Sequence, residues 1–539
     1  MSIIKANGAG DQDTGFYNGV ATQSLRLNNS ASSLLTRTPS AGDRKTWTWS
    51  AWIKRSDTGR DQDFFTAEGS GAQLFAIMIT SGDQIQIYGA NSVLLLTNQL
   101  SRDTSAWYNI VVKSDTTQGT AANRLKLYVN GSEVTSFATD NRDNYAQNTD
   151  YGINSNVKHN IGSNQAGGNF GHYYIAEVNF VDGTALDASY FGETKNGVWI
   201  PKKYTGSYGT QGFRLEFKQT GDGSSTASSS TIGADTANSN HYKDTNLDAH
   251  DSNMPDSPEN NFATMGNMAF PLTNDNISEG NLKVGQTDQH VHVSTFGIPT
   301  SGKWYWEVNT VSSNGSNYYA PYTGVVNSTF FHTYQAQTGN AGDDLRNTAG
   351  LAYIRGNDTN YKNLTGTAVA EGSNKSGEDT TTHEQGILGL ALDSDAGTLK
   401  YYWNNSLART DSTLTAGDLY FPYQFGTNSG SNSWNFNYFN FGQDSSFAGT
   451  LTGGDVGTAT DGNGNGKFKY APPTSHLALC TDNIPEPVIG PNSDTQANDH
   501  FNTVLYTGNA GTLNVTGVGF QPDWVWIKRR AATRSHMLY

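Results

Sequence analysis

Three aromatic side chains alternate with amides in a short stretch near residue 436. Trp434, Phe436 and Tyr438 share one face of an expected strand, and Asn435 and Asn437 share the other, because successive strand residues point to opposite faces. Aromatic rings stack on sugar rings, and amides hydrogen-bond to hydroxyl groups. The stretch is therefore a candidate glycan-binding site. Packing of the same three rings in a protein core is the favoured alternative.

A second candidate is a metal-binding loop at Asp461, Asn463 and Asn465. Their side-chain oxygens recur at alternate positions and Gly466 follows at the sixth, as in the first half of a calcium-binding loop. Pro472 stands at the twelfth position, where such a loop needs a bidentate Glu. A flexible linker is therefore favoured over a calcium site, and no other cofactor is expected.

Motifs for catalysis are incomplete in this sequence. No Glu begins the Glu-x-Asp-x-x-Glu pattern that would place the acid and the nucleophile of a glycanase on one strand. Residues 297–303 have the spacing of a phosphate loop, but Trp304 stands where Ser or Thr must hold Mg²⁺. His290 and His292 lack partner ligands and are expected to form a surface pair. We therefore predict a protein that is not an enzyme.

Short strands must position these residues. Aromatic residues make up 12% of the 539-residue chain, charged residues 15%, and 59 residues are Gly. This mixture suits many short strands joined by tight turns. No segment longer than about ten residues keeps the apolar repeat of a helix. The chain is therefore predicted to be all-β.

Charge and apolar content exclude several classes of partner and location. The net charge of −15 argues against nucleic acid, because phosphates require a basic surface. No run of about eighteen apolar residues occurs, so no membrane insertion is expected. The N-terminus lacks the pattern of a signal peptide. Cys480 is the single cysteine and is expected to be a buried or inert thiol.

A first strand series occupies residues 21–220. Within it, Leu125, Leu127 and Val129 alternate with polar residues and lead into Asn130-Gly131, which favours a type I′ hairpin turn. One face of this strand should be buried and the other exposed to water. Roughly a dozen such short strands predict a sandwich of two antiparallel sheets.

The landmarks of the first series resemble the laminin G or concanavalin A-like jelly-roll family. In chain order they read TWTWSAWIKR, WYNIVVKSD, LKLYVNGSEV, HNIGSN and GHYYIAEVNFVDGTAL. The resemblance implies the fold of the family. It implies no single function, because the family includes lectins, adhesion modules and glycanases.

A second strand series, residues 261–448, resembles the SPRY family, another β-sandwich. The landmarks are Gly302 to Val308, Gly389 to Asn405, Leu419 to Pro422, and Asn440 to Phe447. In this register the strand with Phe436 is the last core strand, which is why core packing is favoured there. SPRY domains are interaction modules, so the resemblance implies binding and not catalysis.

The other segments are expected to connect or extend the two sandwiches. Residues 1–20 are predicted to form an N-terminal arm. Residues 221–260 should form a polar linker and 449–499 a Gly/Pro-rich linker, because few large apolar residues occur there. Residues 500–539 begin a third β-module, with too few residues to complete a sandwich of their own.

The order of these modules resembles large virion proteins of tailed bacteriophages. It runs from a laminin G-like sandwich through a SPRY-like sandwich to the segment GVGFQPDWVWIK. This resemblance implies a tail fibre or tail-associated adhesin, made in the bacterial host cytoplasm and located in the virion tail. It also implies other virion proteins and a host-surface glycan or receptor as partners, and a homo-oligomer, with a trimer expected. A non-receptor decoration of the head or collar and a polysaccharide depolymerase are the alternatives.

Overall fold

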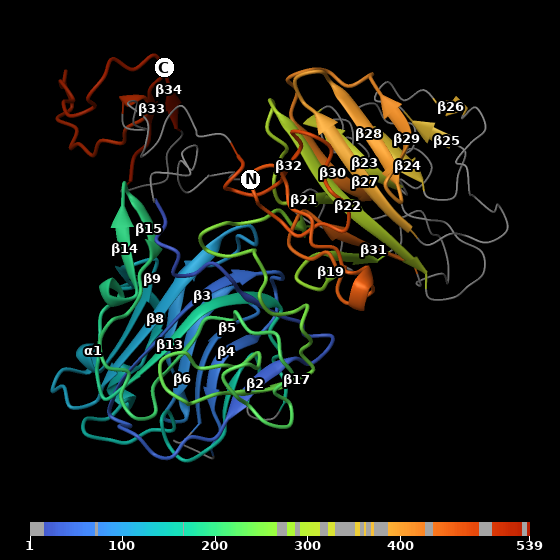
Figure 1. The fold of residues 1–539 in the computed structure, drawn as a ribbon. Coiled ribbons are helices and arrows are strands. Elements are labelled where there is room, and N and C mark those ends of the chain that lie inside the picture. The colour runs from blue at the N-terminus through green and yellow to red at the C-terminus, as the bar shows by residue number, and fades with distance from the viewer. Residues whose placement is uncertain are drawn as a thin grey trace.

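The structure is a computed structural model, in which two β-sandwiches lie one after the other along the chain (Figure 1). It describes residues 16–69, 74–164, 167–266, 277–285, 291–312, 322–328, 351–355, 360–362, 368–370, 386–425, 435–484, 499–530 and 536–539. Nearly all regular elements in these ranges are strands, and the sandwich sheets pair almost entirely antiparallel. The predicted all-β class with tandem sandwiches is confirmed.

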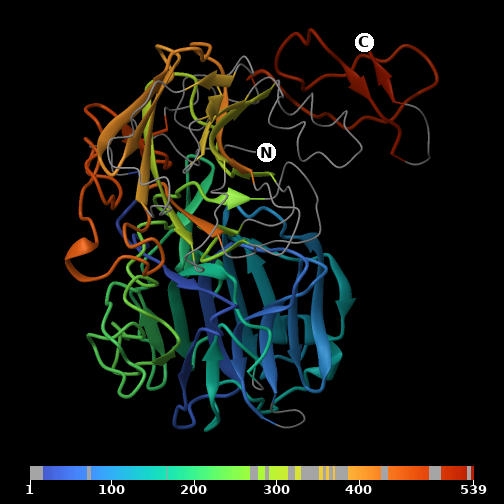
Figure 2. The same ribbon diagram turned by 90° about the vertical axis from the view of Figure 1, so that its right-hand side faces the viewer.

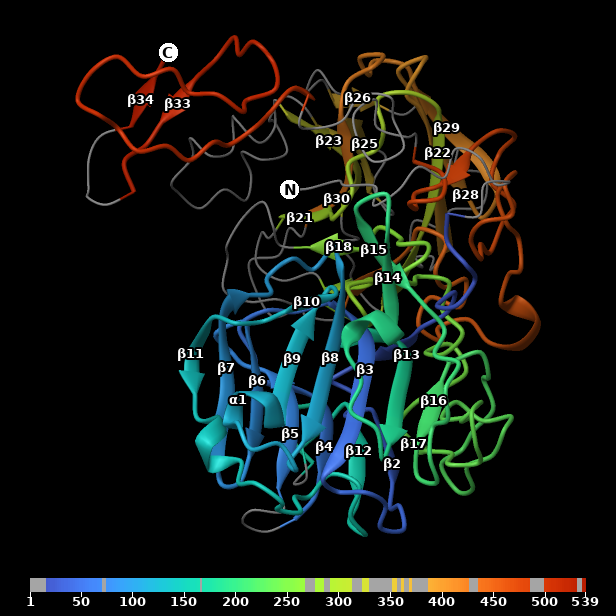
Figure 3. The same ribbon diagram turned by 90° about the vertical axis from the view of Figure 1, so that its left-hand side faces the viewer.

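The first sandwich packs two sheets face to face, which we call the front sheet and the back sheet after their order in Figure 3. In spatial order the front sheet holds β1 (Leu25–Leu27), β13 (Tyr173–Asp182), β3 (Thr46–Arg55), β8 (Trp107–Asp115), β9 (Leu125–Val129) and β10 (Ser132–Glu133), with β16 (Phe213–Leu215) also pairing with β13. The back sheet holds β11 (Phe137–Asp140), β7 (Ser92–Leu100), β6 (Gln84–Gly89), β5 (Phe75–Ile79), β4 (Gln62–Ala67), β12 (His159–Ile161), β2 (Leu34–Arg37) and β17 (Lys243–Thr245). Short helical turns lie at α1 (Ala121–Arg124), η2 (Arg142–Asn144) and η3 (Ala188–Tyr190).

The predicted hairpin is formed by β9 and β10. Leu125, Leu127 and Val129 are buried in the core of the first sandwich, and Asn130 and Gly131 both have positive φ. The opposite face of β9 differs from the prediction, because Tyr128 is buried as well. A cluster that includes residues 186–204 covers this face of the front sheet, next to the hairpin of β14 (Gly192–Lys195) and β15 (Val198–Pro201).

Residues 221–260 are not a linker, contrary to the prediction from composition. Their strand β17 pairs with β2 and extends the back sheet. Tyr242 is buried in the core and meets the ring of Phe213 at a centroid distance of 4.9 Å. The polar residues of the segment are used for hydrogen bonds to the backbone: Asp235, for example, accepts one from the Arg214 N–H at 2.9 Å. Composition shows the polarity of such residues but not their partners.

The predicted N-terminal arm docks on the same chain where the structure describes it. The carboxylate of Glu259 accepts hydrogen bonds from the backbone N–H groups of Gly19, Val20 and Ala21 at 2.7–3.0 Å. The side chains of Phe16 and Val20 are buried. Residues 16–21 therefore belong to the body of the first sandwich.

The second sandwich also has two sheets, and it lies above the first in the view of Figure 2. One sheet holds, in spatial order, β18 (Met265–Gly266), β21 (Val291–Ser294), β30 (Tyr420–Phe425), β23 (Tyr322–Asn327), β24 (Leu351–Arg355), β25 (Asn360–Lys362) and β26 (Ala368–Ala370). The other holds β19 (Ile277–Ser278), β20 (Lys283–Gly285), β31 (Asn435–Asn440), β22 (Lys303–Ser312), β27 (Gly386–Asp393), β28 (Thr398–Trp403) and β29 (Ser406–Asp411). Trp304, Trp306 and Val308 of β22 face its core, as their alternation predicts.

The described part of the predicted Gly/Pro-rich linker, residues 449–484, also packs on a sandwich. Its strand β32 (Leu477–Ala478) pairs in parallel with β22, and a short turn, η5 (Gly453–Asp455), precedes it. Phe468 and Cys480 are buried against the outer face of the sheet that contains β22. The linker prediction is therefore wrong for these residues, because a few well-spaced apolar side chains suffice to dock the segment.

The C-terminal segment forms a small two-stranded sheet of β33 (Trp526–Ile527) and β34 (Met537–Leu538). The side chains of Trp524 and Trp526 are both exposed. Among the described residues, no helix is long and apolar enough to cross a bilayer.

Candidate functional site at the junction of the two sandwiches

The two sandwiches meet where β3 ends and β13 begins. Tyr174 of β13 packs in the hydrophobic cluster of the second sandwich, and its hydroxyl donates a hydrogen bond to the Gly280 carbonyl at 2.9 Å. Lys54 of β3 donates to Asp256 Oδ2 at 2.8 Å and to the Phe262 carbonyl at 2.9 Å. Burial lowers the pKa of Lys54 and raises that of Asp256. Because these polar groups are buried, the junction depends on keeping each of them paired.

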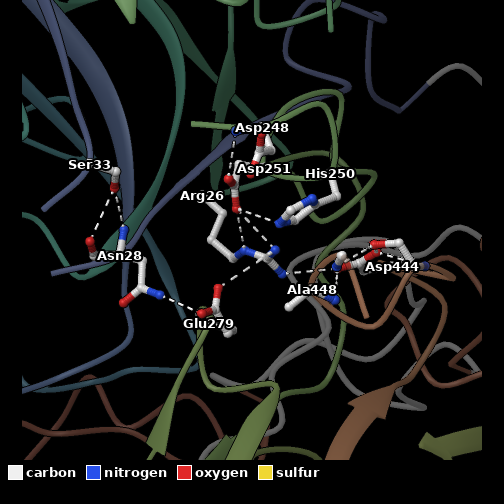
Figure 4. A network of polar contacts seen from close by, with 12 residues as sticks. Arg26, Asn28, Ser33, Asp248, His250, Asp251, Glu279, Asp444 and Ala448 are labelled. Carbon is white, nitrogen blue, oxygen red and sulfur yellow. Dashed lines mark hydrogen bonds and ion pairs between the residues drawn. The ribbon is translucent and has the colours of Figure 1, made fainter. Parts of the chain in front are cut away.

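Arg26 lies at the centre of the junction and contacts carboxylates from both sides (Figure 4). Its guanidinium is 3.0 Å from Asp251 Oδ1, 3.2 Å from Asp444 Oδ2 and 3.9 Å from Glu279 Oε2. Burial would lower the pKa of Arg26, but the three carboxylates outweigh it and raise the pKa. Together, these four residues form what we call the Arg26 network.

The Arg26 network is a structural connection and not a ligand site. Burial would raise the pKa of Asp444, but Arg26 and the N–H and O–H donors of residues 446–448 keep it below its usual value. Asp444 Oδ1 accepts from the Ser446 N–H, and Oδ2 accepts from the Ala448 N–H and from Arg26. Both oxygens of this carboxylate are thus occupied within the protein.

A cavity of about 480 Å³ lies beside the Arg26 network. Residues 248–254 line one side, and the loops after β31, with Lys467, line the other. Its polar groups are largely paired inside the protein: Lys467 Nζ donates to the Asn253 carbonyl at 2.6 Å, and Ser446 bonds to Asp444. We therefore do not assign a ligand to this cavity.

A second cavity, of about 390 Å³, lies between the loops of the first sandwich and the β19–β20 hairpin of the second, and we call it the junction pocket. The first sandwich supplies the loop after β3, the loop before β8 and the residue that precedes β13. The second supplies β18, β19 and the turn after β19. The described lining residues are Ser56, Asp57, Thr58, Arg60, Arg102, Thr104, His172, Gly266, Ile277 and Asn281.

Asp83 holds the loops of the junction pocket in place. Its carboxylate accepts hydrogen bonds from the Gly59 N–H at 3.1 Å, from Arg55 at 3.0 Å and from Arg102 Nε at 3.0 Å. Burial would raise the pKa of Asp83, but these donors outweigh it and lower the pKa. Gly59 adopts a positive φ of 74°, which a residue with a side chain rarely adopts. The loop from 56 to 61 is thereby fixed to the loop that carries Arg102.

Three buried polar atoms in the described pocket lining have no hydrogen-bond partner among the residues that the structure describes. They are Ser56 Oγ, His172 Nε2 and Asn281 Oδ1. The three residues are only 8%, 3% and 4% exposed. An unpaired buried polar group costs about 1–3 kcal/mol, so a ligand or water that completes these bonds is favoured. The junction pocket is therefore a cavity whose described lining has unused hydrogen-bonding capacity.

The sequence gives almost no signal for this pocket. Its residues come from loops far apart in the chain, and each loop alone reads as an ordinary polar turn. Only the pairing of β3 with β13 and the docking of the second sandwich bring His172 and Asn281 together. Of the residues that we expected to bind glycan or metal, none that the structure describes lines it.

The aromatic strand lies elsewhere, and its faces differ from the prediction. Trp434 lies outside the described residues. Asn437 is buried on the same face of β31 as the core residue Phe439, so the amide face is the one that points into the sandwich. Phe436 and Tyr438 point to the other face and pack with Phe447 under the residues that follow the strand.

A cation already occupies the open ring faces of this strand. Lys283 Nζ lies 4.3 Å from the ring centroid of Phe436 and 5.4 Å from that of Tyr438. A sugar that stacks on these rings would have to displace the ammonium group. Glycan binding at Phe436 and Tyr438 remains a prediction, and the junction pocket has the better geometry.

The Asp461 loop is a turn held by its own hydrogen bonds. Asp461 Oδ1 accepts from the N–H groups of Asn463 and Asn465 at 2.9 Å, and Oδ2 accepts from Asn483 Nδ2 at 2.6 Å. The amides of Asn463 and Asn465 donate to Asn483 Oδ1. Donors thus surround the carboxylate where a calcium ion would need oxygen atoms. Calcium binding by this loop remains a prediction.

Two further residues that could take part in chemistry, Cys480 and His292, are buried in the protein. Cys480 is buried, as expected, and burial raises the pKa of its thiol. His292 is buried and not on the surface, contrary to the expected surface pair, and His290 lies outside the described residues. In the described ranges, no group of three or more His, Cys, Asp and Glu side chains is arranged to hold a metal ion.

Residues 28–189 match the family model of the Concanavalin A-like lectin/glucanases superfamily. The first sandwich is a concanavalin A-like domain. Residues 496–539 match a domain of unknown function, DUF7483, in the segment that we expected to begin a third module. No curated protein sequence shows significant similarity to the chain.

Several solved structures are similar to parts of this chain. A protein from Bacteroides ovatus with a proposed carbohydrate-binding role is 14% identical with a TM-score of 0.28, and the match covers 42% of this chain and 58% of that one. A heptameric SAP-like pentraxin from Limulus polyphemus is 16% identical with a TM-score of 0.24, covering 32% and 80% of the two chains. The SPRY domain of human HERC1 is 15% identical with a TM-score of 0.22, covering 30% and 88%.

Proposed function

We propose that the protein is a non-enzymatic carbohydrate-binding attachment protein, and that the junction pocket is where it binds. The observation that carries the proposal is the set of three unpaired, buried polar atoms in a pocket at the end of a concanavalin A-like domain. The superfamily description names lectins and glucanases. Asp57 is the only acidic residue in the described pocket lining. The described lining therefore lacks the pair of carboxylates that a glycanase uses as acid and nucleophile.

The chemistry of the lining suits a small polyhydroxyl ligand. Hydroxyl, amide, imidazole and carboxylate groups surround the cavity, and they supply both donors and acceptors to sugar hydroxyls. Ile277 offers an apolar surface for the C–H face of a sugar ring. The volume of about 390 Å³ lies within the range of about 300–1,000 Å³ that is usual for small-ligand sites.

We further propose that the protein acts as part of a virion. The order of modules resembles tail-associated proteins of tailed bacteriophages, which supports host attachment through a surface glycan. Several copies in a homo-oligomer, with a trimer expected, would multiply a weak contact at each pocket. A non-receptor decoration of the head or collar and a polysaccharide depolymerase are the competing functions.

A glycan panel with a pocket-filling variant tests this function. Thr104 lines the pocket and is partly exposed, so Thr104→Trp should fill the pocket without disturbing the core. We expect the native protein to bind a subset of glycans and Thr104→Trp to lose that binding. Thr120→Trp, at an exposed turn before α1 and past the opposite end of β8 from Thr104, is the matched control and should bind normally.

The alternatives give different results in the same experiment. Failure of the native protein to bind any glycan or host cell would overturn the proposal in favour of a structural decoration. Release of new reducing ends from host polysaccharide would favour the depolymerase. Equal binding by the native protein and Thr104→Trp would place the site outside the junction pocket.

A further inference from the structure

Two arginine side chains stand at the opening of the junction pocket. Arg60 is 52% exposed at its side chain, and Arg102 is 64% exposed. Arg102 uses Nε for Asp83 at 3.0 Å, so the outer edge of its guanidinium is turned away from that carboxylate. Arg60 Nη1 lies 3.6 Å from Asp57 Oδ2, which is a loose ion pair. Both groups therefore retain donors that point to solvent or to a ligand.

The pocket carries the opposite sign of charge from the chain as a whole. Its described lining has two arginines and one aspartate, and the buried Arg55–Asp83 pair beside Arg102 adds no net charge. The formal charge of these groups is therefore +1. The whole chain carries −15. A locally positive opening attracts an anionic ligand, and the negative charge of the rest of the protein surface repels that ligand.

We infer that the junction pocket takes a sugar that carries a carboxylate, such as a uronic or a sialic acid residue. This inference rests on the proposed carbohydrate-binding function and adds the class of sugar. A planar guanidinium pairs with a planar carboxylate through two parallel hydrogen bonds, which a neutral hydroxymethyl group cannot form.

The interior of the pocket matches the rest of such a sugar. Asp57 Oδ2 lies 3.8 Å from His172 Nδ1, beyond a normal hydrogen bond, so it can accept a bond from a sugar hydroxyl. His172 Nε2, Asn281 Oδ1 and Ser56 Oγ lie in the lining without partners in the described part of the chain. The carboxylate would thus sit at the arginine opening and the hydroxyls would point inward.

Binding of glycans compared in pairs, with and without a carboxylate, tests whether the pocket recognises the charge of the sugar. The panel contains acidic glycans with uronic or sialic acid residues, each beside the same glycan after reduction of its carboxyl group to an alcohol. It also contains sulfated glycans that carry no carboxylate. We expect binding to the acidic members, and a loss of about tenfold in affinity on carboxyl reduction, as for a charge-assisted hydrogen bond. Affinity for the acidic members should also fall as salt is raised, because the two arginines are exposed.

Substitution of Arg60 separates this inference from the proposed function. Arg60→Gln should lower affinity for acidic glycans about fivefold. It should lower affinity for their reduced partners much less, because the glutamine amide can still donate a hydrogen bond to a hydroxyl group. Arg529→Gln removes the same charge from an exposed site in the C-terminal segment and should change nothing. Because Arg60 is largely exposed, its substitution should leave the fold intact.

The outcomes are distinguishable. Equal binding of acidic and reduced glycans, still blocked by Thr104→Trp, would overturn the carboxylate inference and keep the carbohydrate-binding function. Equal binding of sulfated and carboxylated glycans would show recognition of charge without the planar carboxylate and would also overturn it. Absence of binding to every member would overturn the proposed function itself.

Discussion

Glu307 illustrates how one buried carboxylate can attach a segment to a sheet. Its Oε1 accepts from the Tyr470 N–H at 2.8 Å and from the Tyr305 hydroxyl, and its Oε2 accepts from the Lys469 N–H at 2.9 Å and from the Asn440 amide. Burial outweighs these bonds and raises the pKa of Glu307 to about 7. The side chain therefore binds a proton more readily in the folded protein than in the unfolded chain.

This raised pKa predicts how stability depends on pH. The contribution of Glu307 is fully present below its unfolded pKa of about 4.5 and is lost as pH rises through about 7. Subtracting the unfolding free energy of Glu307→Gln from that of the native protein isolates this group. We expect the difference to fall by on the order of 3 kcal/mol between pH 4.5 and pH 8 in urea unfolding experiments.

Glu193→Gln is the control for this prediction, because Glu193 is about half exposed on β14 and buries no charge. Its difference curve should be flat over the same pH range. A native-minus-Gln difference for Glu307 that rises with pH would show that the four donors outweigh burial.

At the level of elements, Tyr242 tests whether residues 221–260 belong to the first core. Truncation of a buried aromatic side chain costs about 3–5 kcal/mol, because it removes apolar burial and leaves a cavity. We expect Tyr242→Ala to lower the unfolding free energy by about that amount in denaturant titrations. Tyr190→Ala, which removes a ring that is 48% exposed, should cost less than about 1 kcal/mol. Unchanged stability in Tyr242→Ala would restore the linker interpretation.

The alternation of apolar and polar residues predicted the strands well, because it depends only on residues that are neighbours in the sequence. Leu125 to Val129 and Trp304 to Val308 show their buried faces directly in the sequence. The second face of a strand could not be predicted. Tyr128 is buried only because residues from about 60 positions further along the chain cover it, and Asn437 points inward where alternation favoured the aromatic rings.

The candidate site was not predictable for a related reason. Composition identifies residues 221–260 and 449–484 as polar, but it does not reveal that carboxylates such as Asp235 and Glu307 bind backbone N–H groups. Sugar-binding and metal-binding motifs were sought on single strands and loops. The junction pocket instead combines five short segments, and their proximity depends on the docking of whole sandwiches.

On the scale of the whole molecule, the Arg26 network predicts that the two sandwiches unfold together. Arg26→Met removes the shared cation and leaves Asp251, Glu279 and Asp444 without it, and breaking such a buried pair typically costs about 3–5 kcal/mol. We expect one calorimetric transition for these two units in the native protein and two separate transitions in Arg26→Met.

Two further variants check that interpretation. Lys202→Met removes an exposed cation with a long 4.0 Å contact to Glu193 and should keep the single transition. Adding Asp444→Asn to Arg26→Met removes one unpaired buried charge and should recover part of the stability. Two transitions already present in the native protein would contradict the coupling.

A crystal structure of the protein with an acidic glycan from the panel tests the central claim most directly. We predict that the sugar lies in the junction pocket, with hydroxyl groups within hydrogen-bond distance of His172 Nε2 and Asn281 Oδ1, and with its carboxylate beside Arg60 or Arg102. A sugar bound on Phe436 and Tyr438, or anywhere else outside the junction pocket, would contradict the account.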